Sequence, residues 1–363
     1  MTDDGFPIWL EYLNNPDAWG ENHEPINPED IRPGCHPFYL IHPAGEERDA
    51  IVLLHGLSDS PWFMRAVGWR LHHQAGLNVY APLLQGHGLK KPNSMQGVSE
   101  LVWLRNSAWA VHHARTSSPK VSVGGLSTGG AIATLMAFRD QDCEDLADGS
   151  PRELHFSSNT ESAGGNGGDG ATEQVINGGV MLYSAALRLQ KKLLIRGRTL
   201  ESLLRSPVGS ILDMVNELME QPEDGVDPLI GDHPYRYARV DIGAARELAK
   251  VINRLDQKRR NGLGGKLRGL QKRLFVSHSD ADTTADIRAL ENLCRATRNN
   301  GFGEVKFFRF GKGFQIPHAS TVLAEVAFGQ SGSPLEPANP FFTAMMAAAM
   351  ASDVVCPQQS SSK

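Results

Sequence analysis

Short, mainly apolar runs alternate along the first part of the chain with segments whose apolar residues have helical spacing. Four such runs precede residue 125, at residues 37–41, 50–54, 77–81 and 121–123. The run at 50–54 is unbroken, as is typical of a strand that is buried on both faces. Because strands and helices alternate, the pattern predicts an α/β fold with a doubly wound, mostly parallel sheet.

The alternation stops near residue 140 and resumes later in the chain. Polar residues at 144–177 include a Gly-rich run at 163–170, and they predict a flexible insertion. Leu- and Arg-rich segments with helical spacing fill residues 186–270, where we expect a helical cap inserted into the sheet domain. Three further strands are predicted, at residues 179–183, 273–277 and 305–310.

These changes in residue pattern divide the chain into predicted segments. Residues 1–35 are polar and Pro-rich and predict a short helix with an extended arm. Residues 36–185 and 271–355 form the predicted core, and residues 356–363 a disordered tail. The late apolar stretch at 341–355 is too short to span a bilayer and predicts a docked C-terminal helix.

The composition of the chain indicates which binding partners and which cellular compartment to expect. The 363 residues suit one large α/β domain with insertions, and the net charge of -5 gives no reason to expect a nucleic acid or an anionic membrane as partner. The four cysteines lie far apart without metal-ligand spacing, which favours free thiols in a reducing compartment. The first residues lack the features of a signal peptide, so a cytoplasmic protein without stable membrane insertion is expected.

The sequence Gly125-Leu126-Ser127-Thr128-Gly129 has the pattern G-x-S-x-G, with a predicted strand before it and a predicted helix after it. In this context the serine sits on a strained turn at the edge of an α/β sheet and acts as a nucleophile. The N-terminus of the following helix stabilises an oxyanion. A Gly-rich turn with an incidental serine is the alternative interpretation.

A serine hydroxyl becomes a good nucleophile only when a base removes its proton and an acid orients that base. In this fold the order along the chain is Ser, then Asp or Glu, then His. The loop after residue 277 contains Asp280 and Asp282, and the loop after residue 310 contains His318, which opens an expected helical segment at 319–328. We favour Asp282 because it precedes the next predicted helix, with Asp280 as its rival. A structural histidine is the alternative for His318.

Two possible calcium sites lack the sequence pattern that calcium binding requires. Asp280, Asp282 and Asp286 lack the Gly and the terminal Glu of a calcium loop. The Gly-Asp run at 163–170 occurs once, whereas such repeats bind calcium only when they are stacked. No metal is therefore expected, and a serine nucleophile with its base and acid requires no organic cofactor.

Five motifs stand in the order found in one superfamily. They are His55-Gly56-Leu57, Gly86-His87-Gly88, Gly125-Leu126-Ser127-Thr128-Gly129, Ser279-Asp280-Ala281-Asp282 and Pro317-His318. With them the chain resembles the α/β-hydrolase superfamily, in particular its carboxylesterase and monoacylglycerol-lipase-like branch. The resemblance covers roughly residues 36–140, 178–185 and 270–330. Ser279 stands where the family usually has Gly, and the cap aligns with no part of the family.

The resemblance implies a role for each matching residue. Ser127 would be the nucleophile, His318 the base and Asp282 the acid that orients it. The backbone N–H groups of Leu57 and Thr128 would form the oxyanion hole. His55 and His87 occupy positions that shape the loops around the site, so both are expected to be structural.

The implied activity is that of a serine carboxylic-ester hydrolase, which takes a small-molecule ester or an acylglycerol through an acyl-enzyme. A peptidase, a thioesterase or an acyltransferase uses the same triad, and a non-catalytic binding member of the fold is a further alternative. Acyl-chain length and oligomeric state do not follow from these motifs.

Overall fold

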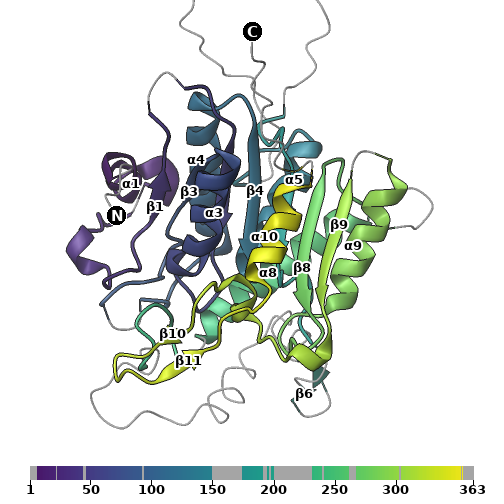
Figure 1. Ribbon diagram of the computed structural model, residues 1–363. Coiled ribbons are helices and arrows are strands. Elements are labelled where there is room, and N and C mark those ends of the chain that lie inside the picture. Colours follow the sequence, from purple (N-terminus) through teal and green to yellow (C-terminus); the bar gives the residue numbers. More distant parts are fainter. Residues whose placement is uncertain are drawn as a thin grey trace, which may run out of the picture.

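The computed structural model describes residues 6–21, 23–43, 46–91, 94–148, 174–190, 194–195, 198–199, 231–238, 241–260, 267–301, 304–352 and 354. These residues form a seven-stranded sheet covered on both faces by helices (Figure 1). The sheet order is β1-β3-β2-β4-β5-β8-β9. The strand bounds are β1 Phe38–Leu40, β2 Ala50–Leu54, β3 Asn78–Ala81, β4 Val121–Leu126, β5 Val180–Tyr183, β8 Leu274–Ser279 and β9 Val305–Phe310.

The sheet is mostly parallel. Only β1 pairs antiparallel within it, with Tyr39 opposite Tyr80 of β3. The doubly wound α/β class predicted from the sequence is thus confirmed. Because β3 and β4 lie on opposite sides of β2, the strand order reverses there, and ligands bind such sheets at the carboxyl ends of the strands beside the reversal. The loops after β2 and β4 lie at this point.

Side chains along each buried strand alternate between two hydrophobic cores. In β2, Val52 and Leu54 belong to one core, whereas Ile51 and Leu53 belong to the other. The first core lies under α4 Glu100–Ser117, α5 Thr128–Gln141, α8 Ile242–Arg260 and α9 Ile287–Asn299. The second lies under α3 Arg65–Ala75 and α10 Phe342–Met350, the docked C-terminal helix that the sequence predicted.

The N-terminal residues pack more closely than the extended arm expected from their composition. They form α1 Phe6–Leu13, α2 Pro16–Trp19 and the short 3-10 helix η1 Pro28–Asp30. Tyr12 and Trp19 are buried against the core, and Asn106 of α4 donates a hydrogen bond to the Ala18 carbonyl at 2.7 Å. Aromatic side chains bury much apolar surface, which explains why this polar segment docks.

The helix α8 lies outside the cap in which the sequence analysis placed it. It lies inside the interval 186–270, yet it packs against α5 and α4 in the layer that covers the sheet. Leu248, Val251 and Ile252 are buried in the core, and Lys258 pairs with Asp142 at 3.0 Å. The apolar stripe of α8 needs the sheet-covering helices to bury it, so α8 belongs to the core layer.

The segment after His318 also differs from its prediction. A helix was expected at 319–328, but only the 3-10 helix η5 Ala319–Val322 forms there. The chain then enters β10 Ala327–Phe328, which pairs with β11 Pro334–Glu336. Asn339 donates hydrogen bonds to the carbonyls of Thr321 and Leu323, both at 2.9 Å, and so occupies acceptors that a continuing helix would use.

The other boundary predictions fall partly or wholly outside the described residues. Of the predicted insertion 144–177, the described ends contain the buried residues Leu146 and Ile176. The predicted tail 356–363 lies outside. The described part of the predicted cap, besides α8, comprises residues 186–190, 231–238 and 267–270 and the short strands β6 Leu194–Ile195 and β7 Arg198–Thr199. Among the described residues, no helix combines the length and the apolar composition that crossing a bilayer requires.

Candidate active site

The turn between β4 and α5 holds Ser127 in a strained conformation. Its φ of 52° and ψ of -115° are rarely adopted by residues other than glycine. The Ser127 N–H donates to the Tyr183 carbonyl at 3.1 Å, and the Ser127 carbonyl accepts from Ala186 N–H at 2.9 Å. Contacts on both sides thus fix the turn, and the side chain stands at the carboxyl edge of the sheet.

Glycine is required at two positions of this turn. A Cβ on Gly125 would lie 2.4 Å from the carbonyl carbon of Gly129, and a Cβ on Gly129 would lie 2.2 Å from the carbonyl oxygen of Leu54. Both obstacles are backbone atoms, which cannot rotate away. The close approach of α5 to β2 and β4 is therefore what the glycines of the pentapeptide make possible.

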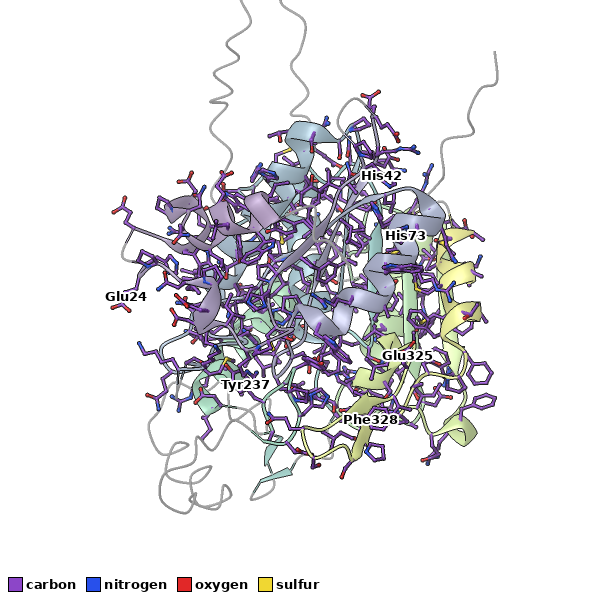
Figure 2. The ribbon with its side chains drawn as sticks, turned by 60° about the vertical axis from the view of Figure 1, so that its left-hand side comes forward. Glu24, His42, His73, Tyr237, Glu325 and Phe328 are labelled. Atoms are coloured by element: carbon purple, nitrogen blue, oxygen red, sulfur yellow. The ribbon has the colours of Figure 1, made fainter. Side chains whose placement is uncertain are left out.

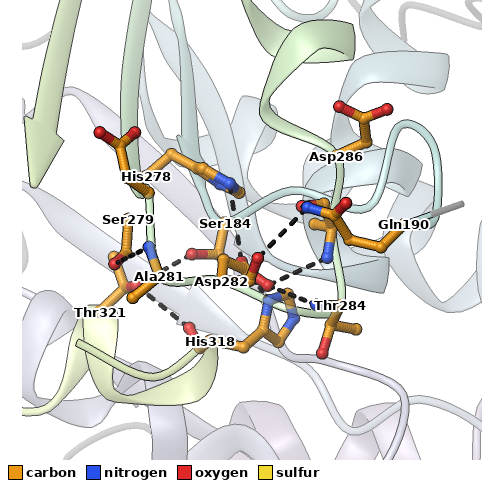
Figure 3. A network of polar contacts seen from close by, with 12 residues as sticks. Ser184, Gln190, His278, Ser279, Ala281, Asp282, Thr284, Asp286, His318 and Thr321 are labelled. Carbon is orange, nitrogen blue, oxygen red and sulfur yellow. Dashed lines mark hydrogen bonds and ion pairs between the residues drawn. The ribbon is translucent and has the colours of Figure 1, made fainter. Parts of the chain in front are cut away.

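Asp282 lies in the loop after β8 and accepts a hydrogen bond from His318 Nδ1 at 2.6 Å (Figure 3). Its other oxygen accepts from the N–H groups of Thr284 at 2.7 Å and Ala285 at 3.0 Å. Burial by itself would raise the pKa of this carboxyl group. The neighbouring His318 and His278 and the Thr284 N–H outweigh burial, and the pKa of Asp282 lies below its ordinary value. Asp282 is therefore a buried, ionised partner for His318.

The rival carboxylate has a different partner. Asp280 pairs with Arg309 at 2.6 Å. Asp286 caps α9 by accepting from the Arg288 N–H at 3.0 Å, and it pairs with Arg188 at 2.8 Å. The three carboxylates of this loop thus bind separate partners. Among the described residues, no group of three His, Cys, Asp or Glu side chains is arranged to hold a metal ion.

His318 lies in the segment after β9 and is fixed through its neighbours. Thr321 donates its hydroxyl to the His318 carbonyl at 3.1 Å, and Ser184, at the end of β5, contacts the Thr321 hydroxyl at 2.9 Å (Figure 3). We assign the Nδ1 proton to the bond with Asp282, which leaves Nε2 as a base. This Nε2 is buried and has no hydrogen-bond partner in the described part of the chain. The Ser127 hydroxyl does not form a hydrogen bond with it either. Such contacts are often open before substrate binds.

The loop after β2 borders Ser127. A Cβ built on Gly56 would lie 3.4 Å from Ser127 Cβ. His87 Nε2 lies 2.7 Å from the Leu57 carbonyl and donates to it, which fixes the orientation of that peptide. Within the described residues, the N–H groups of Leu57 and Thr128 donate to no protein acceptor.

The two loop histidines are bound by backbone groups. His55 Nδ1 donates to the Gly56 carbonyl at 2.9 Å, and its Nε2 accepts from the Leu84 N–H at 3.1 Å. Burial, and then the neighbouring His87, hold the pKa of His55 well below its ordinary value. Burial also lowers the pKa of His87. Both side chains bind loop backbone, as expected for structural residues.

Sequence reasoning missed His278 beside the candidate acid. Its side chain is fully buried in β8, and Nε2 lies 3.7 Å from Asp282 Oδ2. Neither ring nitrogen has a hydrogen-bond partner among the described residues. Burial lowers the pKa of His278 to about 4, although the charge of Asp282 opposes this shift. The available signal was a histidine at the end of an apolar strand that leads into the acid loop.

A groove of about 580 Å³ lies apart from these residues, between α3, the loop after η5 and the start of α10. Its apolar lining includes Trp62, Trp69, Leu323, Val326 and Phe342, and it contains none of the candidate triad. Glu325, at its edge, is labelled in Figure 2.

The chain is similar in sequence to one protein family and in fold to several solved structures. A family model described as serine aminopeptidase, S33, matches residues 45–149. A soluble variant of monoglyceride lipase from Saccharomyces cerevisiae is 12% identical, with a TM-score of 0.53 over 90% of this chain and 96% of that chain. A structure reported with LipS and LipT, two metagenome-derived lipolytic enzymes, is 18% identical, with a TM-score of 0.49 over 80% and 92% of the two chains. No curated protein matches the chain.

Proposed function

We propose that this chain is a member of the α/β-hydrolase superfamily and a serine carboxylic-ester hydrolase that works through an acyl-enzyme, which the family-model match over residues 45–149 supports. Ser127 is the nucleophile, His318 the general base and Asp282 the acid that orients the base. The backbone N–H groups of Leu57 and Thr128 form the oxyanion hole. The substrate is a small-molecule ester or an acylglycerol.

In the first half of the reaction His318 Nε2 takes the proton of the Ser127 hydroxyl while Oγ bonds to the carbonyl carbon. The carbonyl oxygen becomes an oxyanion and accepts hydrogen bonds from the Leu57 and Thr128 N–H groups. Asp282 stabilises the imidazolium of His318. The tetrahedral intermediate then breaks its bond to the alkoxy group, which leaves as an alcohol with the proton from His318.

In the second half water attacks the acyl-enzyme. His318 takes a proton from that water, and a second oxyanion forms in the same hole. The bond between the acyl carbon and Ser127 Oγ breaks, the carboxylic acid leaves, and the proton returns to Ser127. These steps require no group beyond the chain and water.

One observation carries the proposal most directly. The 2.6 Å bond from His318 to the buried Asp282 orients an imidazole whose Nε2 has no partner among the described residues. The strained turn presents Ser127 at the same sheet edge. His55, by contrast, has both ring nitrogens bound to backbone groups.

The direct test is hydrolysis of p-nitrophenyl esters by the purified chain and by Ser127→Ala. We expect Ser127→Ala to abolish turnover, because the variant lacks the hydroxyl that the proposed mechanism acylates. A fluorophosphonate probe should label the wild type at Ser127 and leave the variant unlabelled. Substantial activity in Ser127→Ala would overturn the assignment, and absence of both labelling and turnover in the wild type would favour a non-catalytic binding protein.

The description of the family model supports a second candidate, an aminopeptidase with the same triad. The two activities differ in the leaving group and in how the substrate is held, and the triad is common to both. A panel of p-nitrophenyl esters of graded chain length, monoacylglycerols, acyl thioesters and amino-acid p-nitroanilides separates them. We expect the highest kcat/KM for an oxygen ester. A preference for the anilides would favour the peptidase.

A further inference from the structure

Arg236 binds two carboxylates, one from the loop after β2 and one from the end of β11. Its Nη2 lies 3.1 Å from Asp59 Oδ1, and its Nη1 forms an ion pair with Glu336. All three side chains are largely buried, with exposed fractions of 22%, 3% and 15% respectively. A guanidinium group is the side chain best suited to bridge two carboxylates, because its donors form a rigid planar fork.

Asp59 belongs to the loop that carries the Leu57 N–H. Its carboxylate packs against the Cα of Gly56, where an added Cβ would lie 2.2 Å from Asp59 Oδ2. Arg236 Nη2 also donates to the Ser58 hydroxyl at 3.0 Å. The cation therefore contacts the two residues that directly follow Leu57.

The backbone of the segment 231–238 adds two hydrogen bonds to the same loop. The Tyr237 N–H donates to the Ser58 carbonyl at 2.7 Å, and the Ser60 hydroxyl donates to the Tyr235 carbonyl at 2.8 Å. These bonds lie on either side of Arg236 in the sequence. They hold its backbone beside the loop, so the side chain has a fixed origin.

Glu336 connects Arg236 to the segment that carries His318. It ends β11, and its Oε2 accepts from the Ser320 hydroxyl at 3.3 Å. Ser320 lies two residues after His318, in η5. Figure 2 places Tyr237 and Phe328 at the same end of the molecule, where Figure 1 shows β10 and β11.

The guanidinium group is also held from its face. It lies over the ring of Phe63, with Cζ 5.3 Å from the ring centroid. The Arg236 carbonyl accepts from Arg32 Nη1 at 3.3 Å. The guanidinium N–H groups, the guanidinium face and the backbone carbonyl of Arg236 all have partners, so the side chain is fixed in one position.

We infer that Arg236 is a positioning residue for the proposed ester hydrolysis. It fixes the loop after β2, which carries the Leu57 N–H, relative to the segment that carries His318. This inference rests on the function proposed above. When the guanidinium is removed, the carboxylates of Asp59 and Glu336 face each other without a cation between them. Their repulsion moves the loop after β2 away from β11. Displacement of the Leu57 N–H weakens binding of the oxyanion, which forms only after attack, so the loss falls on kcat.

The test compares Arg236→Gln and Arg236→Lys with the wild type in ester hydrolysis. Misplacing a catalytic group by about 1 Å costs on the order of a hundredfold in rate. We expect Arg236→Gln to lower kcat about ten- to a hundredfold with KM nearly unchanged. A trifluoromethyl ketone, which forms an oxyanion adduct with the serine, should lose affinity by the same factor. Arg236→Lys should recover only part of kcat, because one ammonium cannot reproduce the fork.

Arg268→Gln is the matched control. Arg268 has the same exposed fraction of 22% and binds the two carboxylate oxygens of Asp142, the residue that follows α5, at 2.6 and 3.1 Å. We expect its loss to lower the thermal midpoint and to leave kcat unchanged. Millimolar guanidinium should restore part of the activity of Arg236→Gln and none in Arg268→Gln, which keeps the test valid if Arg236→Gln is less stable.

The outcomes separate the two proposals. If the wild type hydrolyses no substrate of the panel and Ser127 is not labelled, the proposed function fails. If the wild type is active and Ser127→Ala is not, but Arg236→Gln keeps the kcat and the ketone affinity of the wild type, only the inference about Arg236 fails. Equal losses of kcat in Arg236→Gln and Arg268→Gln would also overturn it, because they would point to general destabilisation.

Discussion

At the scale of single residues, the loop after β8 contains two carboxylates of the same type in opposite environments. Asp282 is buried and binds His318, whereas Asp280 pairs with the half-exposed Arg309. The sequence favours Asp282 because it precedes a predicted helix, and its role as the triad acid stays a proposal. The hydrogen bonds from Thr284 and Ala285 could not be predicted, because they depend on how the loop closes around the carboxylate.

The two carboxylates provide a matched pair of variants. We expect Asp282→Asn to lower kcat by about three to four orders of magnitude, because an amide at this position favours the wrong tautomer of the histidine. Asp280→Asn should stay within a few-fold of the wild type. Steady-state hydrolysis of a p-nitrophenyl ester measures both. The reverse result would make Asp280 the triad acid.

His278 predicts a pH dependence of stability. Its pKa is about 4 in the folded protein and is near 6.5 when the chain is unfolded. Between these values the unfolded state binds the extra proton, so the free energy of unfolding falls as the pH drops from 6.5 to 4, by up to about 3 kcal/mol from this residue. The groups facing His278 are Asp280, Asp282, Asp286 and His318.

Urea unfolding at pH 7 and at pH 4.5 measures the effect. His278→Leu, which is close in volume and cannot titrate, should lose less stability over this interval than the wild type. The buried histidines His55 and His87 remain in both proteins and contribute equally. Equal losses in the two proteins would show that His278 does not keep a depressed pKa.

At the scale of elements, the strand-turn-helix around Ser127 was predictable from local sequence. The predicted strands on either side of it in the sheet, at 50–54 and 179–183, are short apolar runs, as burial on both faces of a sheet requires. The position of the helix α5 follows from the small residues of the pentapeptide, because a Cβ on Gly125 or Gly129 would meet backbone atoms.

Gly129→Ala tests this packing. The added Cβ would lie 2.2 Å from the Leu54 carbonyl oxygen, so β2 and α5 would have to separate. We expect the free energy of unfolding to fall by at least about 2 kcal/mol, with loss of activity. Gly313→Ala is the control, because no atom lies within 4 Å of its added Cβ. An unchanged midpoint in Gly129→Ala would contradict the close approach.

The segment after His318 marks the limit of local prediction. Apolar spacing at 319–328 is compatible with a helix, yet Asn339 takes the carbonyls of Thr321 and Leu323 and β11 pairs with β10. These partners lie more than five residues away, so no local pattern contains them. The role of Arg236 could not be predicted for the same reason, because its carboxylate partners lie 177 residues before it and 100 residues after it in the chain.

At the scale of the whole molecule, the arrangement of domains depends on where α8 packs. The Leu/Arg-rich composition of residues 186–270 predicted a single cap, because sequence alone does not tell which surface an amphipathic helix covers. The contacts of α8 with α4 and α5 place it over the sheet. The described parts of the predicted cap that contact the site loops are then residues 186–190 and the segment 231–238, which contains Arg236.

Ile252→Ala tests the position of α8. Ile252 is fully buried in the core, so the substitution should lower the free energy of unfolding by about 2–5 kcal/mol in one cooperative transition. Gln257→Ala, on the exposed face of the same helix, should change it by less than about 0.5 kcal/mol. Urea unfolding followed by near-ultraviolet circular dichroism measures both variants. A helix in a separate cap would instead give Ile252→Ala an altered substrate preference with an unchanged main transition, because the sheet would not depend on it.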